Sequence, residues 1–113
     1  MNLQNWQTQL RKGLLELVIL NLLSSSARHG YEMVQKLKQI EGLKIREGNI
    51  YPILARLKTD KMIESESQAS PDGPPRKYFR LTELGSANLE QMNGHWEMIS
   101  YSIEHIRTGK EQS

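Results

Sequence analysis

Residues 48–85 constrain the fold of this chain more than any other part of the sequence. A series of apolar residues at helical spacing comes first, and two short strand-like runs follow at residues 62–66 and 76–81. The stretch between the two runs is rich in proline and glycine, which favours a turn. The order therefore predicts a helix followed by a β-hairpin with a long tip.

The helix that opens this segment is the third one predicted in the chain. Its expected apolar face consists of Ile50, Ile53, Leu54 and Leu57. We expect the helix to begin near Glu47, because the apolar period already includes Ile50. Pro52 then falls in the early turns, where a proline is tolerated at some cost.

Two more helices are predicted upstream. The first should bury an apolar face made of Leu10, Leu14, Leu17, Val18 and Leu22, flanked by Leu15, Ile19, Leu20 and Leu23. The second should span residues 30–40 with Gly42 as its C-cap. Its apolar face would be Tyr31, Val34, Leu37 and Ile40.

A fourth helix is predicted after Thr82, which is suited to be its N-cap. Its apolar residues recur at alternating spacings of 3 and 4, as in a heptad seam: Leu89, Met92, Trp96, Ile99, Ile103 and Ile106. Glutamates recur every seven residues on the adjoining polar face: Glu83, Glu90, Glu97, Glu104 and Glu111. A narrow seam needs a partner, which is either the first helix or a second copy of the chain. We favour the second copy, because so long a helix outreaches so small a core.

These elements predict an α+β fold that is mainly α-helical. With 113 residues the chain has the length of one domain. We expect a winged helix-turn-helix over residues 1–81 and a C-terminal dimerisation helix with a tail over residues 82–113, joined in one compact unit.

Charge is distributed unevenly along the chain. Residues 1–81 hold 13 Lys or Arg against 8 Asp or Glu, whereas residues 82–113 hold 2 against 5. An excess of +5 in the first part and −3 in the second suggests that the first part faces an anion. The absence of cysteine excludes disulfides and thiolate zinc sites, and it fits a reducing cytosol.

The apolar run after Arg11 and Lys12 imitates a secretory signal. Glu16 and Asn21 interrupt it, and it is far shorter than the ~20 apolar residues of a membrane span. We therefore predict a cytoplasmic protein with no membrane partner.

In a winged helix-turn-helix, the third helix presents side chains to the major groove of DNA and the hairpin carries cations toward the backbone. Arg76 and Lys77 follow the proline-rich turn and suit that second role. Asn49 suits adenine recognition in principle, and Tyr51 is either half-buried packing or a hydrogen-bond donor to DNA. Some further basic residues should contact phosphates: Lys36, Lys38, Lys44, Arg46, Arg56 and Lys58.

Three ordered motifs closely resemble the PadR family of bacterial transcriptional regulators. They are RKGLLELVILNLLSSSARHGYEMVQKL, which starts at Arg11, GNIYPILARL, which starts at Gly48, and GPPRKYFRLTELG, which starts at Gly73. The resemblance covers roughly residues 10–107, and the single long C-terminal helix is similar to the short subfamily. Lys61 stands where the family usually has glycine, so we expect a strained, left-handed turn there. Arg46 stands where a small polar N-cap is common, so we expect the entry to the third helix to be weakly capped.

The resemblance implies a homodimeric repressor that binds a palindromic operator in double-stranded DNA and is often released by a small molecule. By position, Asn49, Tyr51 and Pro52 would lie at the groove-facing start of the recognition helix, with Arg76 and Lys77 at the wing. Trp96 would lie at the dimer centre beside an effector pocket.

The seam around Trp96 has two interpretations. An indole at this position is either ordinary interface packing or one wall of a cavity for a small aromatic ligand. Trp6 joins that cavity if the first helix begins early, and Met92 would make it adaptable. The predicted effector and dimer residues are Trp96, Met92, Leu89, Ile99, Ile103 and Trp6.

Other functional classes find little support. His29, His95 and His105 share no metal-ligand spacing, and no carboxylate pair or nucleophile motif is present. We predict no enzymatic activity, no cofactor and no metal. The alternative function is a winged-helix protein-interaction module that does not bind specific DNA, which the net charge of +2 would permit.

Overall fold

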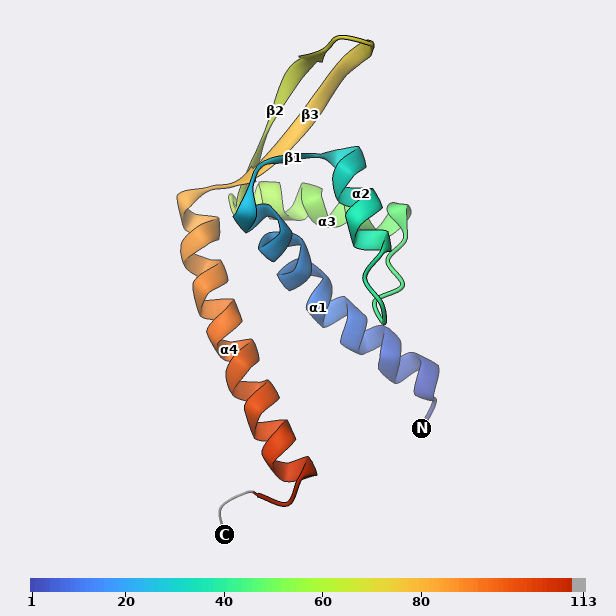
Figure 1. Cartoon of the computed structure of the whole chain (residues 1–113), viewed down its shortest axis with the longest axis vertical. Coiled ribbons are helices and arrows are strands. Elements are labelled where there is room, and N and C mark those ends of the chain that lie inside the picture. Colours follow the sequence, from blue (N-terminus) through green and yellow to red (C-terminus); the bar gives the residue numbers. More distant parts are fainter. Residues whose placement is uncertain (111–113) are drawn as a thin grey trace.

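The computed structural model describes residues 1–110 and contains four helices and one small sheet (Figure 1). The elements in chain order are α1 (Leu3–Ser25), β1 (Arg28–His29), α2 (Gly30–Lys38), α3 (Glu47–Thr59), β2 (Ile63–Ser70), β3 (Gly73–Leu81) and α4 (Glu83–Arg107). The predicted α+β, mainly helical fold is confirmed. Residues 111–113, which end the predicted tail and include Glu111 of the glutamate series, lie outside the described residues.

The core lies where α1, α2, α3 and the base of the hairpin meet. Ile19, Leu20, Met33, Leu37 and Ile50 are completely buried there. The expected apolar face of α3 is confirmed, since Ile50, Leu54 and Leu57 are buried and Ile53 packs against them.

The predicted burial of α1 is only partly confirmed. The flanking set Leu15, Ile19, Leu20 and Leu23 is buried, and Leu17, Val18 and Leu22 of the predicted face pack against this core. Leu10 remains 45% exposed, and Leu14 and Leu17 are only partly buried. The helix carries two apolar faces, and the hydrophobic pattern alone does not tell which of them the protomer covers.

Helix α2 is shorter than predicted and is preceded by a strand that the sequence does not reveal. It ends at Lys38 with Gln39 as C-cap, and Gly42, with a φ of +84°, lies in the turn beyond it. Tyr31 and Ile40 are exposed, so the apolar face of α2 consists of Met33, Val34 and Leu37.

The sheet has the order β1-β3-β2, and all its pairs are antiparallel. The predicted long tip of the hairpin is wrong, because the strands continue to Ser70 and Gly73 and leave only two residues between them. The ladder is irregular between Gln68 and Ser70. Beyond its short pairing with β1 one edge of β3 is open, which is where a strand tolerates prolines.

Helix α4 starts in tight contact with the hairpin. Thr82 caps it as predicted, with its Oγ accepting from the Gly85 amide at 3.0 Å. A Cβ on Gly85 would lie 1.9 Å from the Met62 carbonyl oxygen, so only glycine fits there. Lys61 adopts a left-handed conformation with a φ of 62°, which confirms the expected strain of this turn.

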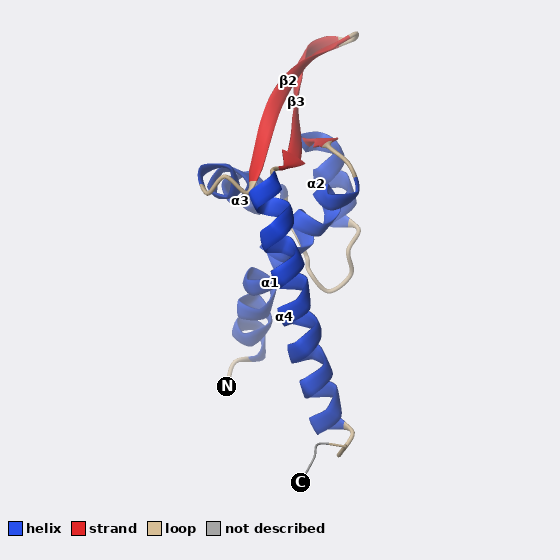
Figure 2. Ribbon diagram, turned by 90° about the vertical axis from the view of Figure 1, so that its left-hand side faces the viewer, coloured by secondary structure: helices blue, strands red, loops and turns tan. Residues whose placement is uncertain are grey.

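The molecule is elongated because the hairpin and α4 project from the core in opposite directions (Figure 2). Its principal extents are 61 × 32 × 21 Å and its radius of gyration is 16.7 Å. A compact chain of this length would have a radius of gyration of about 13 Å. The C-terminal half of α4 therefore extends well past the protomer's own core.

Candidate nucleic-acid interface and apolar groove

Helix α3 presents one long side to solvent. Since Ile50, Leu54 and Leu57 are buried, the opposite side carries the exposed residues Gly48, Pro52, Ala55 and Thr59. These side chains are small, so a partner can approach the helix closely along this side.

Pro52 sits inside α3, as predicted, and the helix begins at Glu47. Proline has no N–H to donate to the carbonyl of Gly48, four residues earlier. Both residues are exposed, and nothing lies within 4 Å of the place where a Gly48 side chain would be. The interruption thus leaves a carbonyl open to polar partners. Arg46 precedes the helix without a side-chain cap, which confirms that the entry to α3 is weakly capped.

Tyr51 lies between the start of α2 and the hairpin. Its ring packs against Gly30, where an added Cβ would be 3.4 Å from both Cε1 and Oη of the tyrosine. The residue is still 45% exposed. Tyr51 therefore combines partial packing with an accessible phenol.

Two basic residues of the hairpin, Arg76 and Lys77, are adjacent on β3. Lys77 pairs with Ser67 and alternates with the buried Phe79, so it lies on the side of the sheet that faces the helices. Arg76 pairs with Gln68, next to the irregular part of the ladder, and borders the same space between the hairpin and the helices. Neither residue forms an ion pair with a carboxylate of residues 1–110.

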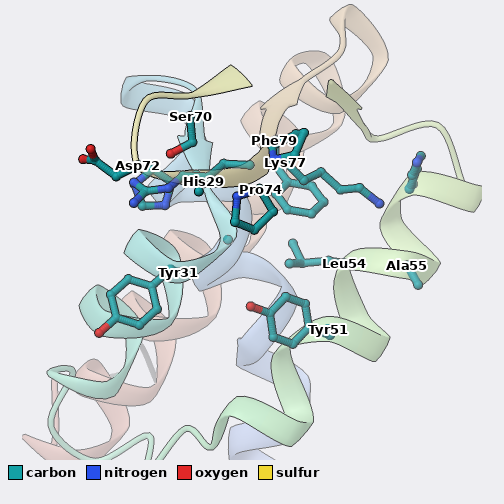
Figure 3. A pocket seen from close by; sticks show the side chains of 15 residues that line it. His29, Tyr31, Tyr51, Leu54, Ala55, Ser70, Asp72, Pro74, Lys77 and Phe79 are labelled. Carbon is teal, nitrogen blue, oxygen red and sulfur yellow. The ribbon is translucent and has the colours of Figure 1, made fainter. Parts of the chain in front are cut away.

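A cleft of about 770 Å³ separates the hairpin from α2 and α3, and we call it the wing cleft (Figure 3). Its aromatic lining is Tyr31, Tyr51, Phe79 and His29, and its cationic lining is Lys58, Arg76 and Lys77. Asp72 at the tip is the one carboxylate among the described residues that line it. The structure thus brings together Tyr51 from the third helix with the predicted wing residues Arg76 and Lys77.

Other predicted DNA contacts lie elsewhere. Arg56 forms an ion pair with Glu16 of α1, although its side chain remains 58% exposed. Asn49 and Arg46 line a second, smaller cleft beside α1. Lys36 is exposed on α2 and borders neither cleft.

The base of the wing carries an ion-pair network of one arginine and two glutamates on its outer side. Arg80 donates from Nε to Glu64 at 2.8 Å and from Nη1 to Glu66 at 3.1 Å. The hydrogen bond to Glu64, followed by that to Glu66, raises the pKa of Arg80. Arg80 is therefore engaged within the sheet, whereas Arg76 and Lys77 are not.

An apolar groove of about 550 Å³ runs between α1 and α4. Its apolar walls are Leu10, Leu14, Leu17, Met92, Trp96 and Ile99, and its polar residues are Gln9, Gln91 and His95. Asn21 and Asn93 exchange two side-chain hydrogen bonds of 2.9 Å between the same helices. The groove uses the α1 face that was expected to lie in the core.

The residues predicted for the effector and dimer site divide into two groups. Leu89 is buried in the protomer's core, and Met92 packs against it. Trp96, Ile99 and Ile103 are between 40% and 50% exposed. Helix α1 does begin early, at Leu3, yet Trp6 lies one turn before Leu10 and does not line the groove.

No helix within residues 1–110 is long and apolar enough to cross a membrane. The same residues contain no group of three histidine, aspartate or glutamate side chains that could hold a metal ion.

Three helices followed by a β-hairpin that projects beside the third helix define a winged helix-turn-helix, here extended by one long C-terminal helix. The chain belongs to the PadR-like family of transcriptional regulators, whose family model matches residues 19–91. This confirms the resemblance seen in the motifs, and a family of transcriptional regulators agrees with the prediction that the chain is not an enzyme.

Solved structures and curated proteins support the same assignment. A PadR-like transcriptional regulator from Bacillus cereus is 38% identical, with a TM-score of 0.79 over 87% of this chain and 95% of the other. A PadR family transcriptional regulator from Eggerthella lenta is 26% identical, with a TM-score of 0.78 over 91% and 89% of the two chains. The transcriptional regulator Rv3488 of Mycobacterium tuberculosis is 31% identical over 74% of this chain and 76% of its own length.

Proposed function

We propose that the chain is a DNA-binding repressor that acts as a homodimer on a palindromic operator. The observation that carries this proposal is the wing cleft beside the exposed side of α3. The small side chains of α3 allow close approach to base edges, and Lys58, Arg76 and Lys77 supply cations for the adjacent phosphates. Membership in a family of transcriptional regulators supports the same function.

The exposed seam of α4 supports the proposed homodimer. Ile99, Ile103 and Ile106 are 40%, 50% and 64% exposed, and in the described chain nothing covers them. A second copy placed on this seam would bury them and would set two recognition helices at half-sites about one DNA turn, ~34 Å, apart.

A gel-shift titration tests DNA binding directly. Fragments selected from random DNA by the purified protein should contain a palindrome, and affinity for it should fall steeply with salt. Equally weak binding to all DNA, unchanged by salt, would contradict the proposal. Retention on immobilised DNA separates this function from the alternative, a protein-interaction module.

The wing and the recognition helix should contribute in different ways. Lys77→Ala should weaken binding to all sequences by about 3- to 10-fold, because it removes a phosphate contact. Asn49→Ala should instead change the base preference within each half-site. If both variants weakened specific and random DNA to the same extent, this division of roles would be wrong.

The apolar groove supports a second part of the proposal, a small aromatic effector that relieves repression. Trp96 and Met92 form an apolar wall facing α1, and His95 with the two glutamines offers hydrogen bonds. Planar aromatic compounds should quench the fluorescence of Trp96. Trp96→Leu keeps Trp6 as the remaining indole, so quenching that persists in this variant would place the ligand outside the groove.

A further inference from the structure

We propose that the small cleft between α1 and the loop that joins α2 to α3 binds a backbone phosphate of the DNA strand that lies opposite the wing. The inference rests on the proposed function and adds α1 to the DNA-contacting elements. We call this site the α1 cleft; its polar residues are Thr8, Arg11, Lys44, Arg46 and Asn49.

The pairing of the arginines is the first observation. Arg28, Arg56, Arg80 and Arg107 each form an ion pair with a glutamate. The other three of the seven arginines, Arg11, Arg46 and Arg76, form none with any carboxylate of residues 1–110. Arg76 borders the wing cleft, and the remaining two border the α1 cleft. The arginines left for an external anion are thus gathered at these two clefts.

The position of the α1 cleft relative to α3 is the second observation. Tyr51 and Lys58 point from α3 toward the wing cleft, whereas Asn49 points toward the α1 cleft and Arg56 toward α1 itself. The exposed side with Pro52 and Ala55 lies between these two directions. A helix in the major groove has a phosphate backbone on each side of it. The wing cleft can serve one strand, and the α1 cleft is placed to serve the other.

The chemistry of the α1 cleft suits a phosphate. Its volume is about 260 Å³, and none of the described residues that line it is acidic. Arg11 is held by a hydrogen bond of 3.2 Å from Nη2 to the Thr8 hydroxyl, which leaves other guanidinium donors available. Ile45 is buried and anchors the loop, so that Lys44 and Arg46 on either side remain exposed.

The backbone at Lys44 is strained in a way that fits this role. Its φ is 46°, in the left-handed region where a lysine has no intrinsic advantage. Strain of this kind persists where the surroundings enforce it, and it is concentrated at functional sites. Here it sets the direction of Lys44 next to Arg46 at the mouth of the cleft.

The test compares Arg11→Gln and Lys44→Gln with Lys12→Gln, using the full chain and the operator selected by the wild-type protein. Lys12 is the matched control, because it is an exposed cation next to Arg11 that lines neither cleft. Each test variant should lose about 3- to 10-fold in affinity at low salt, and the slope of log Kobs against log[salt] should shrink by about 1. Lys12→Gln should leave that slope unchanged, and all three variants should keep the wild-type base preference and thermal stability.

Ethylation interference locates the contact on the DNA. At least one phosphate on the strand opposite the wing should interfere with wild-type binding and should stop interfering with Arg11→Gln. Salt slopes equal to that of Lys12→Gln would overturn the inference, while the proposed function would still stand on wild-type binding. A second result would also overturn the inference. Inorganic phosphate would stabilise the wild type but not Arg11→Gln, while both proteins bound DNA equally well, since the cleft would then hold a free anion.

Discussion

The surface formed by the hairpin and α3 and the surface formed by the exposed part of α4 both present side chains that suit an external partner, but the chemistry of these side chains differs. Around α3 the open groups are cations and small polar contacts, with Arg76, Lys77 and Lys58 along the wing cleft. Along α4 the open groups are apolar, with Ile103 and Ile106 exposed by half or more. The first surface is suited to a polyanion and the second to another apolar helix.

This difference would explain how one short chain can bind a polyanion and a second copy of itself through separate, selective surfaces. A polyanion gains nothing from the α4 seam, and a second α4 gains nothing from the wing. One junction between the two surfaces lies where the start of α4 touches the turn between α3 and β2. Substitutions at this junction, on the seam and at the edge of the wing cleft should therefore affect the two surfaces to different extents.

The junction should show the largest effect on stability. Gly85→Ala places a methyl group where the Met62 carbonyl oxygen would be only 1.9 Å away, so the start of α4 must move. We expect the free energy of unfolding to fall by about 3 kcal/mol, measured by urea denaturation at fixed protein concentration. Gly94→Ala is the control, because nothing lies within 4 Å of its Cβ position in the same helix. That variant should be neutral or stabilised by up to about 1 kcal/mol, and an equal loss in both would refute the steric explanation.

A substitution on the α4 seam should have the second largest effect. It should disrupt the dimer without altering the DNA-facing surface itself. Ile103→Asp places a carboxylate at the proposed contact between the two α4 helices, so light scattering should report a monomer. DNA affinity should fall by about 100-fold, because the two half-sites are no longer held together. Met98→Asp is the control, since Met98 is 65% exposed on the opposite side of α4. If the wild type were a monomer, or if Ile103→Asp still formed a dimer, the seam would not be the dimer interface.

The two regions also differ in how far the sequence could predict them. Helix α3 was predictable because a single apolar face, Ile50 to Leu57, leaves only one way to bury it. The weak entry at Arg46 and the strained turn at Lys61 were expected because these residues depart from the family's usual ones at helix ends. In α1, by contrast, two apolar faces compete, and only the positions of α2 and α3 decide which of them is covered.

Features that depend on distant contacts were not predictable. Strand β1 has two residues and exists only because they pair with Phe79 and Tyr78, some fifty positions later. The outer hairpin is polar on both faces, so no alternation marks it as strand. The ion pair of Arg56 with Glu16, and the grouping of Arg11 with Arg46, require the packing of α1 beside α3. Spatial arrangement, and not residue type, assigns each of these cations its role.

Substitutions of His29, at the edge of the wing cleft, should have the smallest effect, and they should alter only the surface formed by the hairpin and the helices beside it. His29 caps α2, with Nδ1 accepting from the Glu32 amide at 3.1 Å, and its ring meets Tyr78 of β3 edge-on at a centroid distance of 5.5 Å. His29→Ala removes both contacts and should lower the free energy of unfolding by about 1 kcal/mol. His29→Asn restores a capping oxygen but not the ring contact, so it should recover most of that loss. Neither variant should change the dimer seen by light scattering, because His29 contacts the hairpin and the start of α2 and is not part of the seam. A shift of the dimer equilibrium in His29→Ala would show that the two surfaces are coupled through the sheet.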